Sequence, residues 1–70
     1  MTRPMKRLTF NTIYGDSITG YVQQMDEEQT YLVDVEVITP TGITEYYGTL
    51  IVHSEDVVEI WEGNERVWEW

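Results

Sequence analysis

The sequence contains no cysteine. Disulfide bonds and thiolate metal sites are therefore excluded, and with them the covalent staples that stabilise many small domains. The 70 residues predict a single domain, 1–70, whose core is small relative to its surface. Self-association is the remaining common way to stabilise such a chain, so we expect a homo-oligomer.

Long hydrophobic runs are also missing. No apolar run reaches the roughly 18 residues that a membrane-spanning helix needs. The opening stretch "MTRPMKRLTF" has no apolar segment behind its basic residues, unlike a signal peptide. We therefore expect a soluble cytoplasmic protein without a membrane partner.

Basic residues are scarce. Four of them face thirteen acidic residues, which gives a formal net charge of −9, and three of the four are Arg3, Lys6 and Arg7. Diffuse binding to a phosphate backbone needs a basic surface. Any contact with nucleic acid must therefore be local, either at this N-terminal cluster or at a site shielded from the general field. The simpler interpretation is an acidic surface that only keeps the protein solvated.

Catalytic motifs are missing as well. The sequence has one histidine, His53, and neither a Gly-rich phosphate loop nor an HExxH pattern. Adjacent carboxylates such as Asp26 and Glu27 suit acid–base work or a divalent cation. In a chain with thirteen acidic residues, such pairs are expected by chance. We predict that the protein is not an enzyme and holds no cofactor or metal.

The patterns that are present predict an all-β chain. Segments rich in β-branched and aromatic residues alternate with the turn signals "GDS", "DEEQT", "PTG" and "HSED". In the segment from 31 to 39, Val33, Val35 and Val37 alternate with two acidic residues, which predicts a half-buried strand with the three valines on one face. No segment predicts an amphipathic helix. The expected strands cover residues 6–14, 18–25, 31–39, 44–52 and 57–61.

The C-terminal segment 62–70 is predicted to be an extension or a hairpin. Gly63 and Asn64 are suited to a two-residue hairpin loop, after which a last strand folds back. Trp61, Trp68 and Trp70 crowd into this part of the chain. Clustered tryptophans predict packing or a subunit contact, and base stacking is the alternative.

Five short strands predict a small, strongly bent five-stranded barrel of the SH3 or Sm type. An open sheet of this size would leave both of its faces and both of its edge strands exposed to solvent, which favours the barrel. Gly20 and Gly48 lie inside expected strands, where glycine commonly marks a sharp bend or a close backbone approach. We expect residues 1–5 to form an N-terminal arm, with an N-terminal helix absent or vestigial, because "MTRPM" leaves no room for one.

Two segments resemble the signatures of the Sm/LSm family. The segment from 18 to 37 resembles the first signature, in which spaced hydrophobic residues and a glycine lead to a hydrophobic–Asp pair and a third strand. The segment from 47 to 60 is similar to the second, in which a glycine opens the fourth strand and acidic residues lead into a Val-Val strand. The matching residues are Ile18, Gly20, Val22, Met25, Asp26, Leu32, Val33, Val35, Gly48, Leu50, Ile51, Val52, Asp56, Val57, Val58 and Ile60.

The resemblance implies a ring that binds single-stranded RNA near a central pore, but the base-binding positions depart from the family pattern. Glu28 stands where the family stacks a ring on uracil, and Thr30 where an asparagine reads the base edge. His53 and Ser54 replace the closing Arg-Gly pair. A carboxylate cannot stack, and a hydroxyl reads a base less well than a carboxamide. The candidate RNA-binding residues are Asp26, Glu28, Thr30, His53, Ser54, Arg3, Lys6 and Arg7.

His53 has three interpretations. It is a strand-end residue whose imidazole meets Glu55 or Asp56, a pore-lining binding residue, or a metal ligand that only a ring would repeat. In the ring that the resemblance implies, the fourth strand of one subunit pairs with the fifth strand of the next. The candidate interface residues are Tyr46, Tyr47, Ile51, Val58 and Trp61.

Two function classes therefore stay open. The first is an Sm-like homo-oligomeric ring that binds single-stranded RNA. The second is an acidic protein-interaction module, including an inhibitor that imitates nucleic acid and binds no RNA. A mimic should present its carboxylates in rows on one face, whereas an RNA binder should have a neutral or basic pocket.

Overall fold

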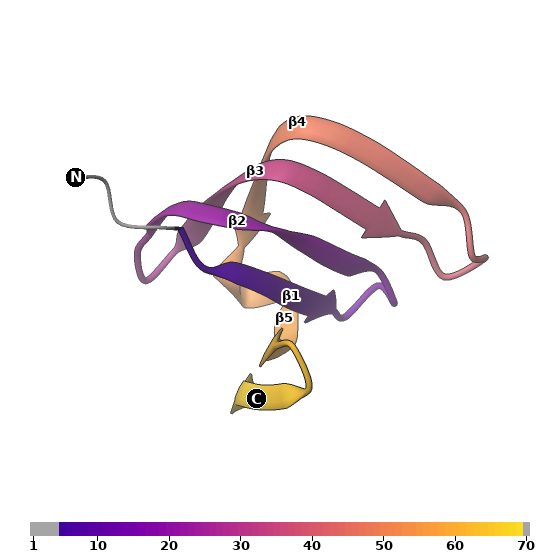
Figure 1. Cartoon of the computed structure of the whole chain (residues 1–70). Helices are drawn as coiled ribbons and strands as arrows, with labels where there is room; N and C mark the ends of the chain where they lie inside the picture. Colours follow the sequence, from indigo (N-terminus) through magenta and orange to yellow (C-terminus); the bar gives the residue numbers. More distant parts are fainter. Residues whose placement is uncertain (1–4, 70) are drawn as a thin grey trace.

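The computed structural model of the chain describes residues 5–69, and these form one antiparallel sheet of six strands. The order across the sheet is β4-β3-β2-β1-β5-β6 (Figure 1). The all-β prediction is confirmed, and each expected strand is present within a few residues of its expected ends. The strands are β1 (Arg7–Thr12), β2 (Ser17–Met25), β3 (Gln29–Ile38), β4 (Thr44–His53), β5 (Val57–Glu62) and β6 (Glu65–Glu69).

Of the two forms expected for the C-terminal segment, an extension or a hairpin, the structure has the hairpin, because β6 folds back on β5. Gly63 has a φ of 60°, a conformation that glycine adopts without steric cost, as a tight hairpin loop requires. The expected count of five strands is therefore one too low. Across the described residues the sheet stays open, with β4 and β6 as its two edges.

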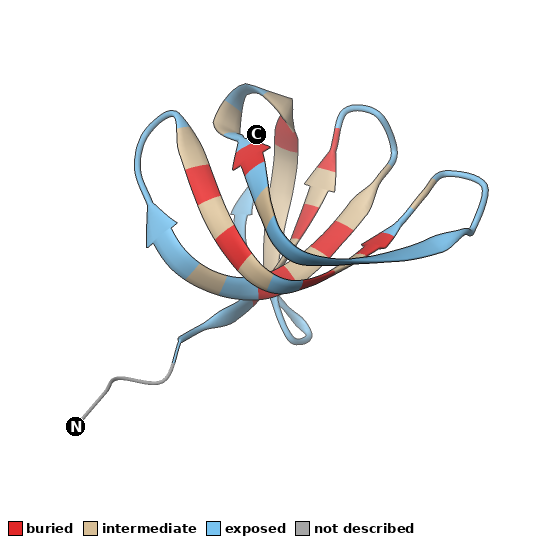
Figure 2. Ribbon diagram, turned by 90° about the horizontal axis from the view of Figure 1, so that it is seen from above, coloured by how far each residue is buried: buried red, intermediate tan, exposed pale blue. Residues whose placement is uncertain are grey.

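The sheet curls so that one face is concave and encloses the core (Figure 2). Alternate residues of β1 point into it: Leu8 and Phe10 are buried, whereas Arg7 is exposed and Thr9 is half-buried. The most enclosed side chains are Phe10, Leu32 and Val35. The buried apolar residues are Leu8, Phe10, Ile18, Leu32, Val35, Val37, Val52 and Val57.

A bulge in β3 produces part of this curl. Asp34 has a φ of 52°, and Gly20 of β2 faces the two residues Asp34 and Val35. The extra residue changes which side chains point inward: Leu32 is buried before the bulge and Val35 after it. The prediction that Val33 shares the buried face is therefore wrong, because an uninterrupted period of two does not survive a bulge.

The connection between β4 and β5 is a single 3-10 turn, η1 (Ser54–Asp56). It contains the last three residues of the "HSED" stretch that was predicted to be a tight connection, and His53 is the last residue of β4. The described residues include no helix that is long and apolar enough to cross a membrane.

Candidate functional site

The part of the predicted RNA site around His53 comes together in the structure. The turn between β2 and β3 lies against η1, because the Ser54 backbone N–H donates to the Glu28 carbonyl over 2.9 Å. Gln29 is paired with His53 across the β3–β4 ladder. These contacts form a hollow of about 450 Å³, which we call the His53 hollow, lined by Glu27, Glu28, Gln29, His53, Ser54 and Glu55.

The His53 hollow is acidic. Glu27, Glu28 and Glu55 line it, and no Lys or Arg of the described chain does. Although Glu55 shares the hollow with His53, no ion pair or side-chain hydrogen bond joins them within residues 5–69. Asp56 instead accepts a hydrogen bond from the Tyr14 hydroxyl over 3.3 Å. Three carboxylates around one imidazole oppose the approach of a phosphate backbone.

Thr30 and Asp26 have different roles from those that the resemblance implies. Thr30 is only 3% exposed and points to the interior, so it does not line the His53 hollow. The Asp26 carboxylate accepts hydrogen bonds from the backbone N–H groups of Glu28 and Gln29, over 2.8 and 2.9 Å. An aspartate that holds its own turn in this way is a structural residue.

The basic candidates lie elsewhere. Arg7 lines a shallow depression beside the β3 bulge, together with Asp34, Glu36 and the tyrosines of β4, and this depression shares no residue with the His53 hollow. Lys6 precedes β1, and its carbonyl accepts a hydrogen bond from the Val22 backbone N–H. Arg3 lies outside the described residues. The predicted RNA-binding residues therefore belong to several separate places.

The predicted interface residues divide between an open edge and a covered strand. On β4, Tyr46 is 77% exposed, Tyr47 41% and Ile51 45%. On β5, Val58 and Trp61 are half-buried. The prediction that β5 offers a free edge to a neighbouring subunit is wrong, because β6 occupies that edge.

The expected tryptophan cluster is split between the two faces of the sheet. Ile60 is opposite Phe10 on one side and Trp68 on the other, so Trp68 shares the concave side with the core. Trp61 is adjacent to Ile60 and points to the convex side, since successive residues of a strand alternate. Trp70 lies outside the described residues.

A network on the convex face attaches β6 to the rest of the sheet. The Asn11 amide donates to the Glu59 carboxylate over 2.8 Å, and Arg66 of β6 lies 3.8 Å from the same carboxylate and over the Trp61 ring. The hydrogen bond from Asn11 is the main reason that the pKa of Glu59 lies below its usual 4.5, and the indole of Trp61 and the charge of Arg66 add to it.

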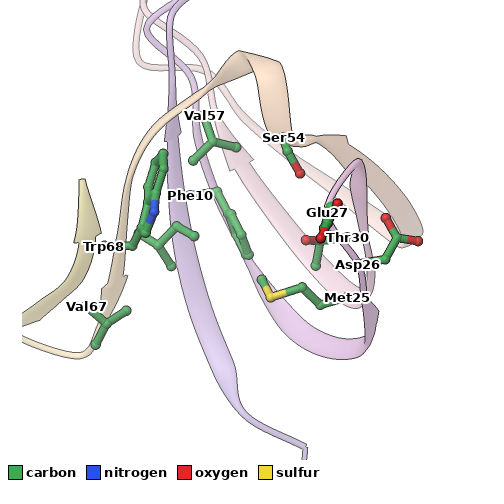
Figure 3. A pocket seen from close by; sticks show the side chains of 10 residues that line it. Phe10, Met25, Asp26, Glu27, Thr30, Ser54, Val57, Val67 and Trp68 are labelled. Atoms are coloured by element: carbon green, nitrogen blue, oxygen red, sulfur yellow. The ribbon is translucent and has the colours of Figure 1, made fainter. Parts of the chain in front are cut away.

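An apolar cavity that the sequence analysis missed opens on the concave side. It has a volume of about 390 Å³ and lies between β6 and the turn that joins β2 to β3 (Figure 3). The run "VW" of the last strand was the available signal, since its alternation would point one of these residues inward. The lining residues are Phe10, Met25, Asp26, Glu27, Thr30, Ser54, Val57, Ile60, Val67 and Trp68.

Within residues 5–69, no group of three or more His, Cys, Asp or Glu side chains is arranged to hold a metal ion. Comparison of the sequence with protein-family models gives no match, and neither does comparison with curated proteins. The resemblance to the Sm/LSm family therefore stays a prediction from the residues quoted above.

Proposed function

We propose that the protein is an acidic protein-interaction module that associates through the free edge of β4, and that a second copy of the chain is its partner. The observation that carries the proposal is the length and exposure of this edge. β4 runs over ten residues, and eight of them are exposed. A long edge strand presents unpaired backbone groups to which another strand adds.

The β4 edge lacks the features that usually prevent such pairing. Edge strands are commonly protected by lysine, proline or inward-pointing charge. β4 has no lysine, arginine or proline, and its one carboxylate belongs to Glu45. Its exposed side chains instead include Tyr46, Tyr47 and Ile51. These side chains would be removed from water by a neighbouring strand, which favours association.

The other edge of the sheet is less suited to self-pairing. β6 is only five residues long, and three of the five are charged: Glu65, Arg66 and Glu69. Two copies of β6 would bring like charges together across the ladder, which is unfavourable. The β4 edge is therefore the better site for a symmetric contact, in which the same surface of each copy meets the other.

We further propose that the fold is a small bent barrel of the SH3 or Sm type. The supporting observation is the position of β1 between β2 and β5, with η1 joining β4 to β5. Without β6, the edges of this sheet would be the two strands that the Sm resemblance assigns to subunit contacts. A ring built on β4 and β5 would require β6 to leave β5.

An RNA-binding Sm-like ring is the second candidate. The observation that favours it is that Glu28, His53 and Ser54 share one hollow, as the resemblance implies. The three carboxylates of the same hollow argue against it, so we rank it below association through β4.

Native mass spectrometry over a range of protein concentration and ionic strength tests the proposal. Each copy carries a net charge of −9, so association is expected to strengthen as salt screens the repulsion. Short mixed-sequence single-stranded RNA is added at low ionic strength. A dimer that ignores RNA supports the β4 proposal, and RNA bound to a ring supports the second candidate. A chain that stays monomeric at high protein concentration and high salt refutes the β4 proposal.

A pair of lysine variants locates the contact. Tyr46→Lys places a charge on the β4 edge, and Ile13→Lys places the same charge on an exposed turn residue outside β4. Both variants change the net charge equally. Tyr46→Lys is expected to weaken the dimer by roughly tenfold, because an edge lysine loses solvation when a strand covers it. Equal weakening by both variants would contradict the assignment to β4.

A further inference from the structure

The apolar cavity on the concave side, which we call the Trp68 cavity, has a buried floor and exposed walls. Phe10 is 1% exposed and Val57 6%, whereas Met25 is 49% exposed, Val67 47% and Trp68 42%. Figure 3 shows Trp68 and Val67 on one side of Phe10 and Met25 on the other. The walls are therefore apolar side chains that remain in contact with water over a buried apolar floor.

The cavity is the part of the curled sheet that stays open. β6 pairs with β5 alone, so the strand that carries Trp68 stands across from the β2–β3 turn without a ladder between them. Exposed apolar side chains are ordinary when scattered, but several that frame one concave space are typical of a binding site.

The rim of the Trp68 cavity determines which ligands it accepts. Asp26 and Glu27 lie at one end, and Figure 3 shows the Ser54 hydroxyl directed toward the same space. No Lys or Arg of the described residues lines it. A ligand with a cationic group beside its apolar part would meet carboxylates at the rim and apolar side chains within, in a protein whose net charge is −9.

We infer that the Trp68 cavity binds one large apolar side chain of a basic peptide, with a lysine or arginine next to that side chain placed at Glu27 on the rim. Its volume of about 390 Å³ falls in the range of small ligand sites. It greatly exceeds the roughly 30 Å³ that one water molecule occupies. A single aromatic side chain therefore fits in it with room for part of its backbone.

A titration followed by two-dimensional NMR of the amide and indole N–H groups tests the inference. The probe is the blocked tripeptide acetyl-Lys-Phe-Lys-amide. Signals of Met25, Val57, Val67 and the Trp68 indole are expected to shift together, with saturation. Acetyl-Lys-Ala-Lys-amide should bind at least about tenfold more weakly, because it lacks the ring that the cavity buries. Acetyl-Glu-Phe-Glu-amide should bind more weakly again, because the rim repels it.

Two aromatic side chains, one inside the cavity and one outside it, provide a pair of variants. Trp68→Ala removes a wall of the cavity and should weaken binding by about tenfold or more. Tyr46→Ala removes an exposed aromatic ring of β4 that does not line the cavity and should leave the affinity unchanged. Glu27→Gln should weaken binding about two- to fivefold at low ionic strength, with the difference lost at high salt. A native-like spectrum of each variant confirms that it is folded.

Three results would overturn the inference. The first is equal binding of the lysine and glutamate peptides, and the second is a probe that shifts signals of β4 instead of the cavity. The third is cavity signals that move with protein concentration alone, which would assign the space to a second copy of the chain. The inference does not depend on the proposed function, because Tyr46→Lys at the β4 edge should leave peptide binding unchanged.

Discussion

Replacing Gly20 by alanine is expected to destabilise the fold, whereas the same replacement at Gly48 is not. A methyl group at Gly20 would lie 3.1 Å from Val35 Cγ2, 3.2 Å from Leu32 Cβ and 3.2 Å from the Val33 carbonyl oxygen. Carbon atoms pack best about 3.5–4.0 Å apart, so the methyl group is too close to Val35 and Leu32, and its contact with the carbonyl oxygen is also tighter than usual. Two of these neighbours belong to or adjoin the backbone of β3 and cannot turn away.

The expected size of the effect follows from two opposing contributions. Overpacking of a well-packed site costs about 1–3 kcal/mol. The loss of glycine's freedom in the unfolded chain offsets about 0.4–1 kcal/mol of this cost. The net destabilisation for Gly20→Ala is therefore about 0–2.6 kcal/mol, with a middle value of about 1.3 kcal/mol. At Gly48 a methyl group would meet no atom within 4 Å, so only the offset remains and the variant should be slightly more stable than the parent.

Urea denaturation followed by tryptophan fluorescence and circular dichroism measures the difference. For a domain of this size each kcal/mol corresponds to a melting shift of about 4–8 °C, so thermal unfolding provides an independent reading. The contribution of intrinsic strand propensity cancels when the stabilities of the two variants are compared, because both variants change Gly to Ala within a strand. If Gly20→Ala proves as stable as Gly48→Ala, then β2 does not approach the β3 bulge as closely as the structure indicates.

Three smaller predictions concern single side chains. Because the folded-state pKa of Glu59 is lowered, chiefly by Asn11, the stability that it contributes is present above its unfolded value of about 4.5 and is lost as the pH falls through the folded value. Asn11→Ala should therefore flatten the stability profile in this acidic range, as measured by urea denaturation at each pH. The pKa of Tyr14 is raised, first by the charge of Asp56, so its contribution is present below about pH 10 and is lost as the pH rises through the folded value. Asp56→Asn should lower the midpoint of the Tyr14 ionisation in an ultraviolet titration. Asp26→Ala should cost about 1 kcal/mol in urea denaturation, because two backbone N–H groups of the β2–β3 turn lose their acceptor.

The strands could be predicted from the sequence because local signals agree along most of the chain. Turn residues separate segments of β-branched and aromatic residues, and the Gly63 loop has the composition of a hairpin. What the sequence could not show was the β3 bulge. A residue such as Asp34 in a left-handed conformation leaves no clear mark in the pattern, so the burial of Leu32 and the partial exposure of Val33 appear only in three dimensions.

The functional site was less predictable for a related reason. Of the positions that the resemblance assigns to base binding, Glu28, His53 and Ser54 line one hollow, whereas Thr30 is buried in the interior. The resemblance did not indicate that the neighbouring residues Glu27 and Glu55 would also line this hollow. Nor did it place Trp68 across the cavity from the β2–β3 turn, because that arrangement depends on how far the sheet curls and not on any local motif.

The charge of the chain and the exposure of β4 are best understood together. An edge of ten residues without lysine, arginine or proline would be prone to uncontrolled pairing in most proteins. Here a net charge of −9 on 70 residues repels a second copy from a distance, so protection is supplied by the whole surface instead of by the strand itself. Protection of that kind is removed by salt or by a basic partner. The β4 contact and the acidic rim of the Trp68 cavity should therefore respond to ionic strength in opposite directions, since screening favours the first and weakens the second.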